Sequence, residues 1–132
     1  MFSGNRPSSG PPRDDEFPVT RSSLSILPGT VEFLVLGALC RGGRMHGFEV
    51  LRWIEETSDG DLLVEEGALY PALHRMEKRG WLRSEWGVSE KGRRAKYYRV
   101  TAAGREGFAD ANREWSRYVE AVGRVVAGEG TP

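Results

Sequence analysis

The C-terminal segment, residues 102–127, places apolar side chains at a regular interval of seven. Two such series occur, offset by three: Phe108, Trp115 and Val122, and then Ala111, Tyr118 and Val125. This spacing is the a/d pattern of a helix that packs against a partner helix. At about 1.5 Å per residue the helix is roughly 38 Å long, more than a small domain can cover. The segment therefore predicts a helix that needs a second chain.

We expect this segment to be a dimerisation helix and the chain to form a homodimer. The expected interface is the apolar face of the helix. Its residues are Phe108, Ala111, Trp115, Tyr118, Val119, Val122, Val125 and Val126.

The rest of the chain has room for one domain, since the whole sequence has 132 residues. Eight of the first twelve residues are Gly, Pro or Ser, and three acidic residues follow at 14–16. Such a segment has too little apolar surface to offset the entropy of ordering it. We expect 1–20 to be a disordered tail, 21–101 to be the folded domain, and 128–132 to be a disordered end.

Three segments of the domain have the periodicity of helices, and two later segments have the composition of strands. The helices are expected at 31–41, 46–57 and 67–79, and the strands at 81–86 and 94–101. The second helix is expected to bury Phe48, Val50, Leu51 and Ile54, and the third to bury Leu69, Ala72, Leu73 and Met76. The prediction is a mainly α protein with a small β-hairpin: a winged helix-turn-helix domain followed by a long C-terminal dimerisation helix.

Alternation along the last strand places Tyr98 on the same side as Val100. We therefore expect Tyr98 in the core and Tyr97 as the more exposed ring. Thr101 is expected to cap the C-terminal helix, and His46 to be a helix cap or a core contact.

Charge is distributed unevenly along a chain that has no net charge. Residues 49–66 hold seven acidic side chains and one basic, whereas 70–99 hold nine basic and three acidic. The second stretch is either a solvated charged face or a surface that binds phosphates, and charge alone does not decide.

The order of elements favours DNA for this basic stretch, because the third helix then becomes the candidate for the major groove and the hairpin becomes the wing. Gly67 and Ala68 have small side chains, so the backbone at the start of the helix can approach the duplex closely. Arg75 is expected at a phosphate rather than at a guanine edge. Tyr70 suits a phosphate or packing against the wing about equally. The expected DNA contacts are Gly67, Ala68, Tyr70, Pro71, His74, Arg75, Lys78, Lys91, Arg93, Arg94, Lys96 and Tyr97.

Five short motifs, in this order along the chain, resemble the PadR family of bacterial regulators. They are Leu27–Thr30, Met45–Val50, Glu66–Leu73, Arg79–Leu82 and Gly92–Thr101. The resemblance covers about residues 27–125 and implies a winged helix, a dimer built through the C-terminal helix and, usually, repression. The sequence departs from the family at Ala68, where a small hydroxyl residue is common.

Enzymatic chemistry is not expected, because no nucleophile, base and acid occur in a convincing arrangement. One cysteine, Cys40, gives neither a disulfide nor a metal-ligand spacing, and it reads as a small buried hydrophobe. We expect no cofactor, no metal and no membrane partner, and a cytoplasmic location.

The expected function is a sequence-specific DNA-binding transcriptional repressor that acts as a homodimer on an inverted-repeat operator. One alternative adds an aromatic effector at the dimer interface around Trp115, because the segment Glu114–Arg117 resembles one in PadR-like regulators that sandwich flat compounds between paired tryptophans. The other alternative is a winged-helix module that binds protein and not DNA.

Overall fold

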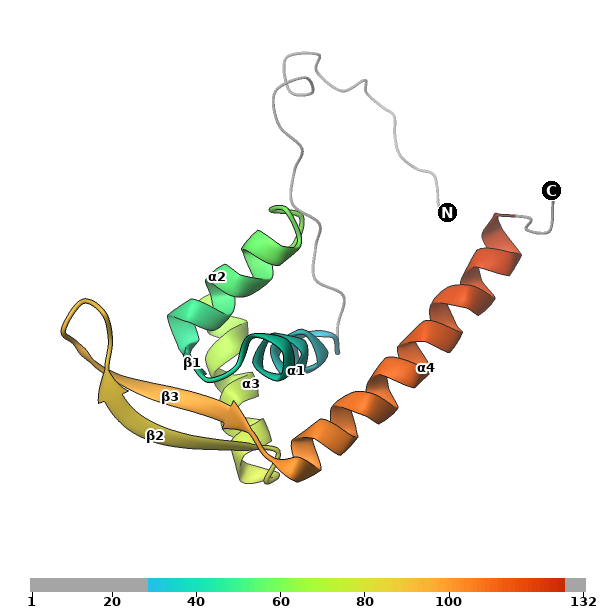
Figure 1. Cartoon of the computed structure of the whole chain (residues 1–132). Coiled ribbons are helices and arrows are strands. Elements are labelled where there is room, and N and C mark those ends of the chain that lie inside the picture. The colour runs from blue at the N-terminus through green and yellow to red at the C-terminus, as the bar shows by residue number, and fades with distance from the viewer. Residues whose placement is uncertain (1–28, 128–132) are drawn as a thin grey trace, which may run out of the picture.

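The structure, a computed structural model, describes residues 29–127. The expected tail at 1–20 and end at 128–132 lie outside this range. The elements are α1 (Val31–Gly42), β1 (Met45–His46), α2 (Gly47–Thr57), α3 (Glu66–Lys78), β2 (Leu82–Val88), β3 (Arg94–Val100) and α4 (Ala102–Val126). Figure 1 shows the β2–β3 hairpin extending from one side of the helical core and α4 extending from another.

Four helices and a small antiparallel sheet confirm the mainly α fold with a β-hairpin. The sheet has the order β1-β3-β2, and its first strand was not predicted. β1 spans two residues, Met45 and His46, which pair with Tyr98 and Tyr97 of β3. A strand of two residues carries no alternation that a sequence could reveal. It nonetheless makes β3 the central strand.

The core lies where α1, α2 and α3 meet the inner face of the sheet. The expected inner face of α3 is confirmed, because Leu69, Ala72, Leu73 and Met76 are fully buried. Val35, Leu36 and Leu39 of α1 fill the space against them, and no polar or charged residue between 29 and 127 is buried. Cys40 is only partly buried at the edge of this cluster, and that burial raises the pKa of its thiol.

The expected inward position of Phe48 is wrong, since half of its surface is exposed and Arg52 lies over its ring. Val50 and Ile54 are buried as expected. At 3.6 residues per turn, Phe48 lies roughly 200° around the helix from Val50 and cannot share its face. The start of α2 is fixed instead by His46, whose Nδ1 accepts from the Glu49 amide while the Glu49 carboxylate accepts from the His46 amide. His46 is thus confirmed as a cap.

Tyr98 is confirmed in the core, but the expected contrast with Tyr97 is slight, with 6% and 9% of their surfaces exposed. The ring of Tyr97 lies on the opposite side of β3, under the Arg44 guanidinium at 4.1 Å and beside the edge of His46. Its hydroxyl donates to the Val88 carbonyl at 3.3 Å. Tyr97 is therefore enclosed by neighbours that come with the unpredicted strand β1.

The first turn of α4 is packed closely onto the end of the core. The Thr101 hydroxyl accepts from the Gly104 amide at 3.1 Å, which confirms the expected cap, and it donates to the Gly80 carbonyl at 2.7 Å. A Cβ at Gly104 would collide with the backbone carbonyl of Trp81, and one at Gly107 would collide with the Trp81 indole. Two glycines therefore allow the first turns of α4 to lie close against Trp81.

A carboxylate joins α1 to α3. Glu32 accepts from Arg75 Nε at 2.9 Å and from Arg79 Nη1 at 3.0 Å. Partial burial raises the pKa of Glu32, but the hydrogen bonds and charges of the two arginines outweigh it, so the pKa lies below the ordinary value. The ionised carboxylate thus stabilises the packing of α3 against α1.

None of the helices within residues 29–127 combines the length and the apolarity needed to cross a membrane.

Gly104→Ala is expected to destabilise the protein by about 1–3 kcal/mol, because the added methyl group meets fixed backbone and α4 must shift. Gly123→Ala, on the same helix, is the matched control: a Cβ there meets open space. It should stabilise the helix by up to about 1 kcal/mol. Thermal unfolding of both variants measures this, and equal melting temperatures would contradict the close approach at Trp81.

Glu32→Gln is expected to cost about 1 kcal/mol of unfolding free energy at neutral pH, since a carboxylate with two partly exposed arginine partners is lost. The contribution is present above the ordinary glutamate pKa and is lost as the pH falls through the lower pKa of the folded state. Urea unfolding at neutral pH and at about pH 3 should therefore show the difference from wild type shrinking in acid. Glu56→Gln, at an exposed ion pair, is the control. A penalty for Glu32→Gln that does not change with pH would refute the charge effect.

Candidate nucleic-acid interface

The exposed side of α3 carries four residues that share one line along the helix: Gly67, Pro71, His74 and Lys78. We call this line the outward stripe. Its members are spaced by four, three and four residues, so they lie on one face. All four are exposed, and the helix continues through Pro71 without interruption. The stripe lies opposite Leu69, Leu73 and Met76, so burial of one face fixes the exposure of the other.

Ala68 and Arg75 belong to a neighbouring flank of α3. Ala68 is exposed. The Arg75 guanidinium is held by Glu32 of α1, although 56% of the side chain remains accessible. The expected DNA contact at Arg75 thus begins from an ion pair inside the domain. Glu32 lies 43 residues before Arg75 in the chain, so neither periodicity nor local charge predicts this pair.

Tyr70 projects from the other flank and packs against the start of α2. A Cβ on Gly47 would lie 2.5 Å from the Tyr70 hydroxyl, so the ring needs a glycine beneath it. Burial, followed by the charge of Glu66, raises the pKa of the phenol, and the hydroxyl stays protonated as a donor. The ring remains 45% exposed. Tyr70 therefore packs on the start of α2, and Tyr98 of β3 is also close enough to contribute to the raised pKa.

The β2–β3 hairpin, which we call the wing, is fixed to α3 through one carboxylate. The Ser84 hydroxyl donates to Glu77 Oε2 at 2.6 Å, and Lys96 Nζ lies 3.5 Å from Glu77 Oε1. From the sequence alone, Glu77 is one of three negative charges within a basic stretch. Its role as the link between helix and wing depends on a strand pairing that periodicity does not specify. Together with the shared core contacts of Leu82 and Tyr98, this link makes the wing and α3 one continuous surface.

The tip of the wing is a short turn at residues 89–93. The Ser89 amide donates to the Arg93 carbonyl at 2.7 Å, and Gly92 has a φ of +76°, which suits glycine. Lys91, Arg93 and Arg94 are all exposed, and Arg94 lies over the Trp86 ring at 4.2 Å. Lys96 is half-buried at Glu77, and Tyr97 is enclosed. Of the expected wing contacts, three are therefore open to solvent and two are used within the domain.

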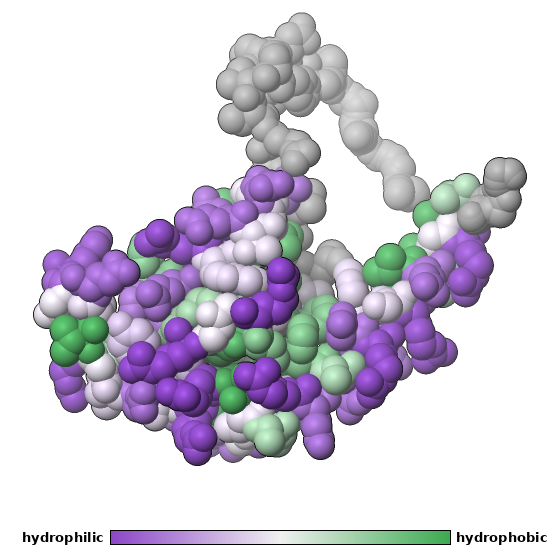
Figure 2. All heavy atoms as spheres, viewed as in Figure 1, coloured by the Kyte–Doolittle hydropathy of each residue, from purple (hydrophilic) through white to green (hydrophobic). Residues whose placement is uncertain are grey.

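The helix α4 divides into a half that packs on its own domain and a half that does not. Phe108 and Trp115 lie 5.7 and 6.1 Å from the Phe33 ring of α1. Beyond them, large apolar side chains are exposed, from 39% at Val122 to 81% at Val125. The others in this group are Tyr118, Val119 and Val126. Figure 2 shows apolar side chains along the protruding helix beside a hydrophilic side.

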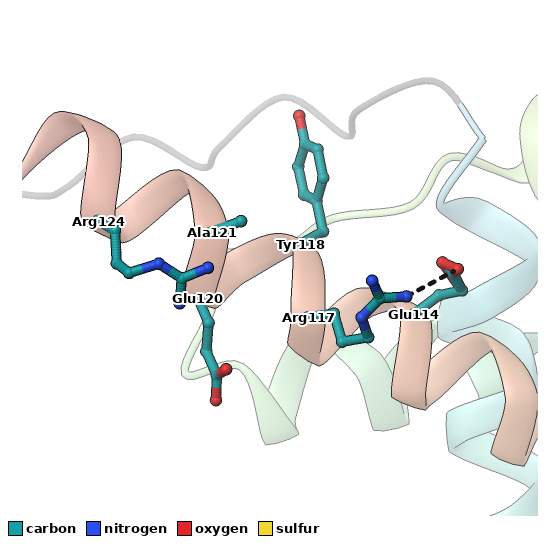
Figure 3. A pocket seen from close by; sticks show the side chains of 6 residues that line it. All are labelled: Glu114, Arg117, Tyr118, Glu120, Ala121 and Arg124. Carbon is teal, nitrogen blue, oxygen red and sulfur yellow. Dashed lines mark ion pairs between the residues drawn. The ribbon is translucent and has the colours of Figure 1, made fainter.

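Two of the hollows formed by residues 29–127 lie next to α4. One, of about 380 Å³, lies between α1, α2 and α4 and is lined by aromatic rings that include Phe33, Trp53 and Phe108. The other, of about 430 Å³, is lined by α4 alone: Glu114, Arg117, Tyr118, Glu120, Ala121 and Arg124. Figure 3 shows Tyr118 pointing away from Glu120 across the helix, with Glu114 and Arg117 paired. The second hollow is thus open surface. Within residues 29–127, no three acidic, histidine or cysteine side chains gather to hold a metal ion.

Comparison with known proteins identifies the family. The model described as the Transcriptional regulator PadR-like family matches residues 35–110. Transcriptional regulator Rv3488 of Mycobacterium tuberculosis is 40% identical over 83 residues, which are 60% of this chain and 77% of that protein.

Solved structures have the same fold. A transcriptional regulator from Clostridium thermocellum superposes with a TM-score of 0.67 at 30% identity, covering 74% of this chain and 94% of that one. Bacillus subtilis PadR in complex with operator DNA is 20% identical with a TM-score of 0.55, covering 61% and 45%, and supports the winged-helix fold. Because the family match spans more than half of the sequence, this chain belongs to the PadR-like family of transcriptional regulators.

Proposed function

We propose that the protein is a homodimeric, sequence-specific DNA-binding repressor that occupies an inverted-repeat operator. The observation that carries the proposal is the single surface formed by the outward stripe of α3 and the wing joined to it through Glu77. A cationic hairpin held beside an exposed helix matches the needs of a duplex, whose phosphates flank its readable base edges.

In this proposal α3 enters the major groove with its outward stripe toward the bases. The groove is about 12 Å wide and accepts a helix. Gly67 and Ala68 allow the backbone to approach, and His74 and Lys78 reach base edges or the adjoining phosphates. Tyr70 donates its hydroxyl to a phosphate from the side of the stripe. Arg75 keeps its ion pair with Glu32 and adds its exposed edge to a phosphate.

The proposed dimer follows from the unpaired half of α4. A contiguous row of exposed apolar residues, Val119, Val122 and Val126 among them, is costly to leave in water. A second copy of α4, packed against this row and into the hollow between α1, α2 and α4, would cover both. Two copies of α3 would then occupy major grooves about one helical turn apart, roughly 34–36 Å, or a multiple of it. Repression follows because an occupied operator excludes polymerase.

A second candidate function adds an aromatic effector at Trp115. This indole is 39% exposed and lies 6.2 Å from the Tyr118 ring in a stacked arrangement. Two such pairs across a dimer axis would hold a flat compound and couple its binding to the spacing of the two α3 helices. A differential affinity of about 1–3 kcal/mol between the two spacings is sufficient. Titration with planar dyes, followed by fluorescence of a variant that retains only Trp115, tests this candidate.

Removing two cations from the wing tip is expected to weaken DNA binding through electrostatics. A gel shift with the DNA upstream of the protein's own gene first establishes binding. If no duplex is bound, the protein-interaction alternative is favoured. With a bound duplex, Lys91→Ala combined with Arg93→Ala should reduce the slope of log K against log salt by up to about two. Arg113→Ala with Arg117→Ala, on the polar side of α4, is the matched control. Equal slopes for wild type and the wing variant would remove the tip from the interface.

Charges placed on the apolar row are expected to dissociate the dimer. Val122→Asp with Val126→Asp puts carboxylates where apolar contacts are proposed, and both sites lie beyond the half of α4 that packs on its own domain. Arg117→Asp with Arg124→Asp, on the polar side, is the control. Sedimentation should report a monomer for the valine variant and a dimer for the control. A dimer in both would place the interface elsewhere.

A further inference from the structure

We infer that Trp86 and Arg94 form a composite minor-groove contact on the wing, in which the indole packs against deoxyribose and the guanidinium lies in the groove, so that the pair favours A·T-rich DNA beside the sequence bound by α3. This inference rests on the proposed function, and it adds a contact that the charged residues of the wing do not provide.

The side of the wing that carries the pair is fixed by contacts nearer the core. Ser84 and Lys96 both meet Glu77 of α3, so this face of the hairpin points toward the helix. Trp86 follows Ser84 by two residues and Arg94 precedes Lys96 by two, and alternation keeps all four on one face. The opposite face is occupied by Arg44, which stacks on Tyr97 and pairs with Glu85.

Trp86 lies beyond the reach of the core and is open to solvent. Its side chain is 56% exposed, and Val88, two residues further along, is 69% exposed. Figure 2 shows a small hydrophobic patch, in green, next to hydrophilic side chains at the projecting end of the wing. Alternation puts Trp86 and Val88 on the same face of β2, so the two exposed side chains form one apolar patch and not a single exposed residue.

The positive charge around the indole indicates that its binding partner is negatively charged. The Arg94 guanidinium lies 4.2 Å above the Trp86 ring, where the electron-rich face stabilises the cation and the cation holds the ring in place. Lys91 and Arg93 are exposed at the adjoining tip. Glu90 is the one exposed acidic residue of this turn, beside the exposed cations Lys91 and Arg93. An indole next to this excess of positive charge complements a surface with apolar walls and negative edges. The minor groove is such a surface, since sugars line it and phosphates border it.

The location is continuous with the surface proposed for α3. When a recognition helix lies in the major groove, a hairpin fixed beside it meets the neighbouring minor groove. A·T-rich tracts narrow that groove and deepen its negative potential, which attracts arginine. The pair therefore adds preference outside the bases that α3 touches.

Binding of the full-length chain to a labelled duplex from upstream of its own gene tests the pair. The duplex is made in two versions, with A·T-rich and G·C-rich flanks, and anisotropy is recorded over a range of KCl concentrations. Trp86→Ala should weaken binding to the A·T-rich version by about tenfold, the effect of roughly 1.4 kcal/mol of lost apolar contact. It should leave the salt slope unchanged and abolish the preference for A·T-rich flanks. Trp86→Phe should retain most of the affinity.

Arg94→Ala should also abolish the flank preference but, unlike Trp86→Ala, should lower the salt slope by about one. Arg83→Ala, an exposed cation of β2 on the opposite face, is the matched control and should change neither flank preference nor affinity. Thermal unfolding checks that each variant stays folded.

The outcomes separate the inference from the function on which it rests. If wild type binds no duplex, the proposed function fails. If wild type binds and Trp86→Ala binds with equal affinity and equal preference, the function stands and the minor-groove contact is refuted. Loss of binding to both versions with a lowered melting temperature, unrelieved in Trp86→Phe, would show that the indole braces the wing and would also refute the contact.

Discussion

The packing of α3 on the core determines which of its residues face solvent and where the wing lies. Leu69, Ala72, Leu73 and Met76 are fully buried, and at helical spacing this leaves one stripe of the helix facing out. A carboxylate stabilises the helix on each flank. Glu32 holds Arg75 and Arg79 toward α1, and Glu77 holds Ser84 and Lys96 of the wing. The outward stripe of α3 is thus held in place by the core behind it and by the contacts of Glu32 and Glu77 on its two flanks.

The position of α4 is also fixed by local contacts, but here small residues that allow close packing are responsible, and not ion pairs. Gly104 and Gly107 bring the helix against Trp81, and Thr101 caps it there. The direction of the helix is set by this first contact and by the packing of Phe108 and Trp115 against Phe33 of α1. The remaining turns carry exposed valines away from the domain (Figure 1). In the proposed dimer, this connection would let the α4 interface set the distance between two copies of α3.

Periodicity predicted the helices and the hairpin to within a few residues, because apolar burial dominates both patterns. Periodicity did not predict the exposure of side chains whose surroundings come from segments distant in the sequence. Two-residue β1 encloses Tyr97, which strand alternation alone left more open. Phe48 was assigned to the core on composition, although its angle around α2 directs it outward. Among the functional candidates, the residue types were readable from the sequence, but the pairing of Arg75 with Glu32 and of Lys96 with Glu77 was not. The sequence places Trp86 in a strand but does not predict its exposure, because the exposure of one strand position depends on how far the hairpin projects.

The central claim is that the stripe of α3 and the wing contact one duplex as a single surface, presented twice by a dimer. Hydroxyl-radical footprinting of the wild-type protein on the DNA upstream of its own gene tests this directly. The account predicts two symmetric blocks of protection whose centres are about 10–10.5 base pairs apart, or a multiple of that spacing. A single block without dyad symmetry, or uniform protection of unrelated sequences, would contradict it.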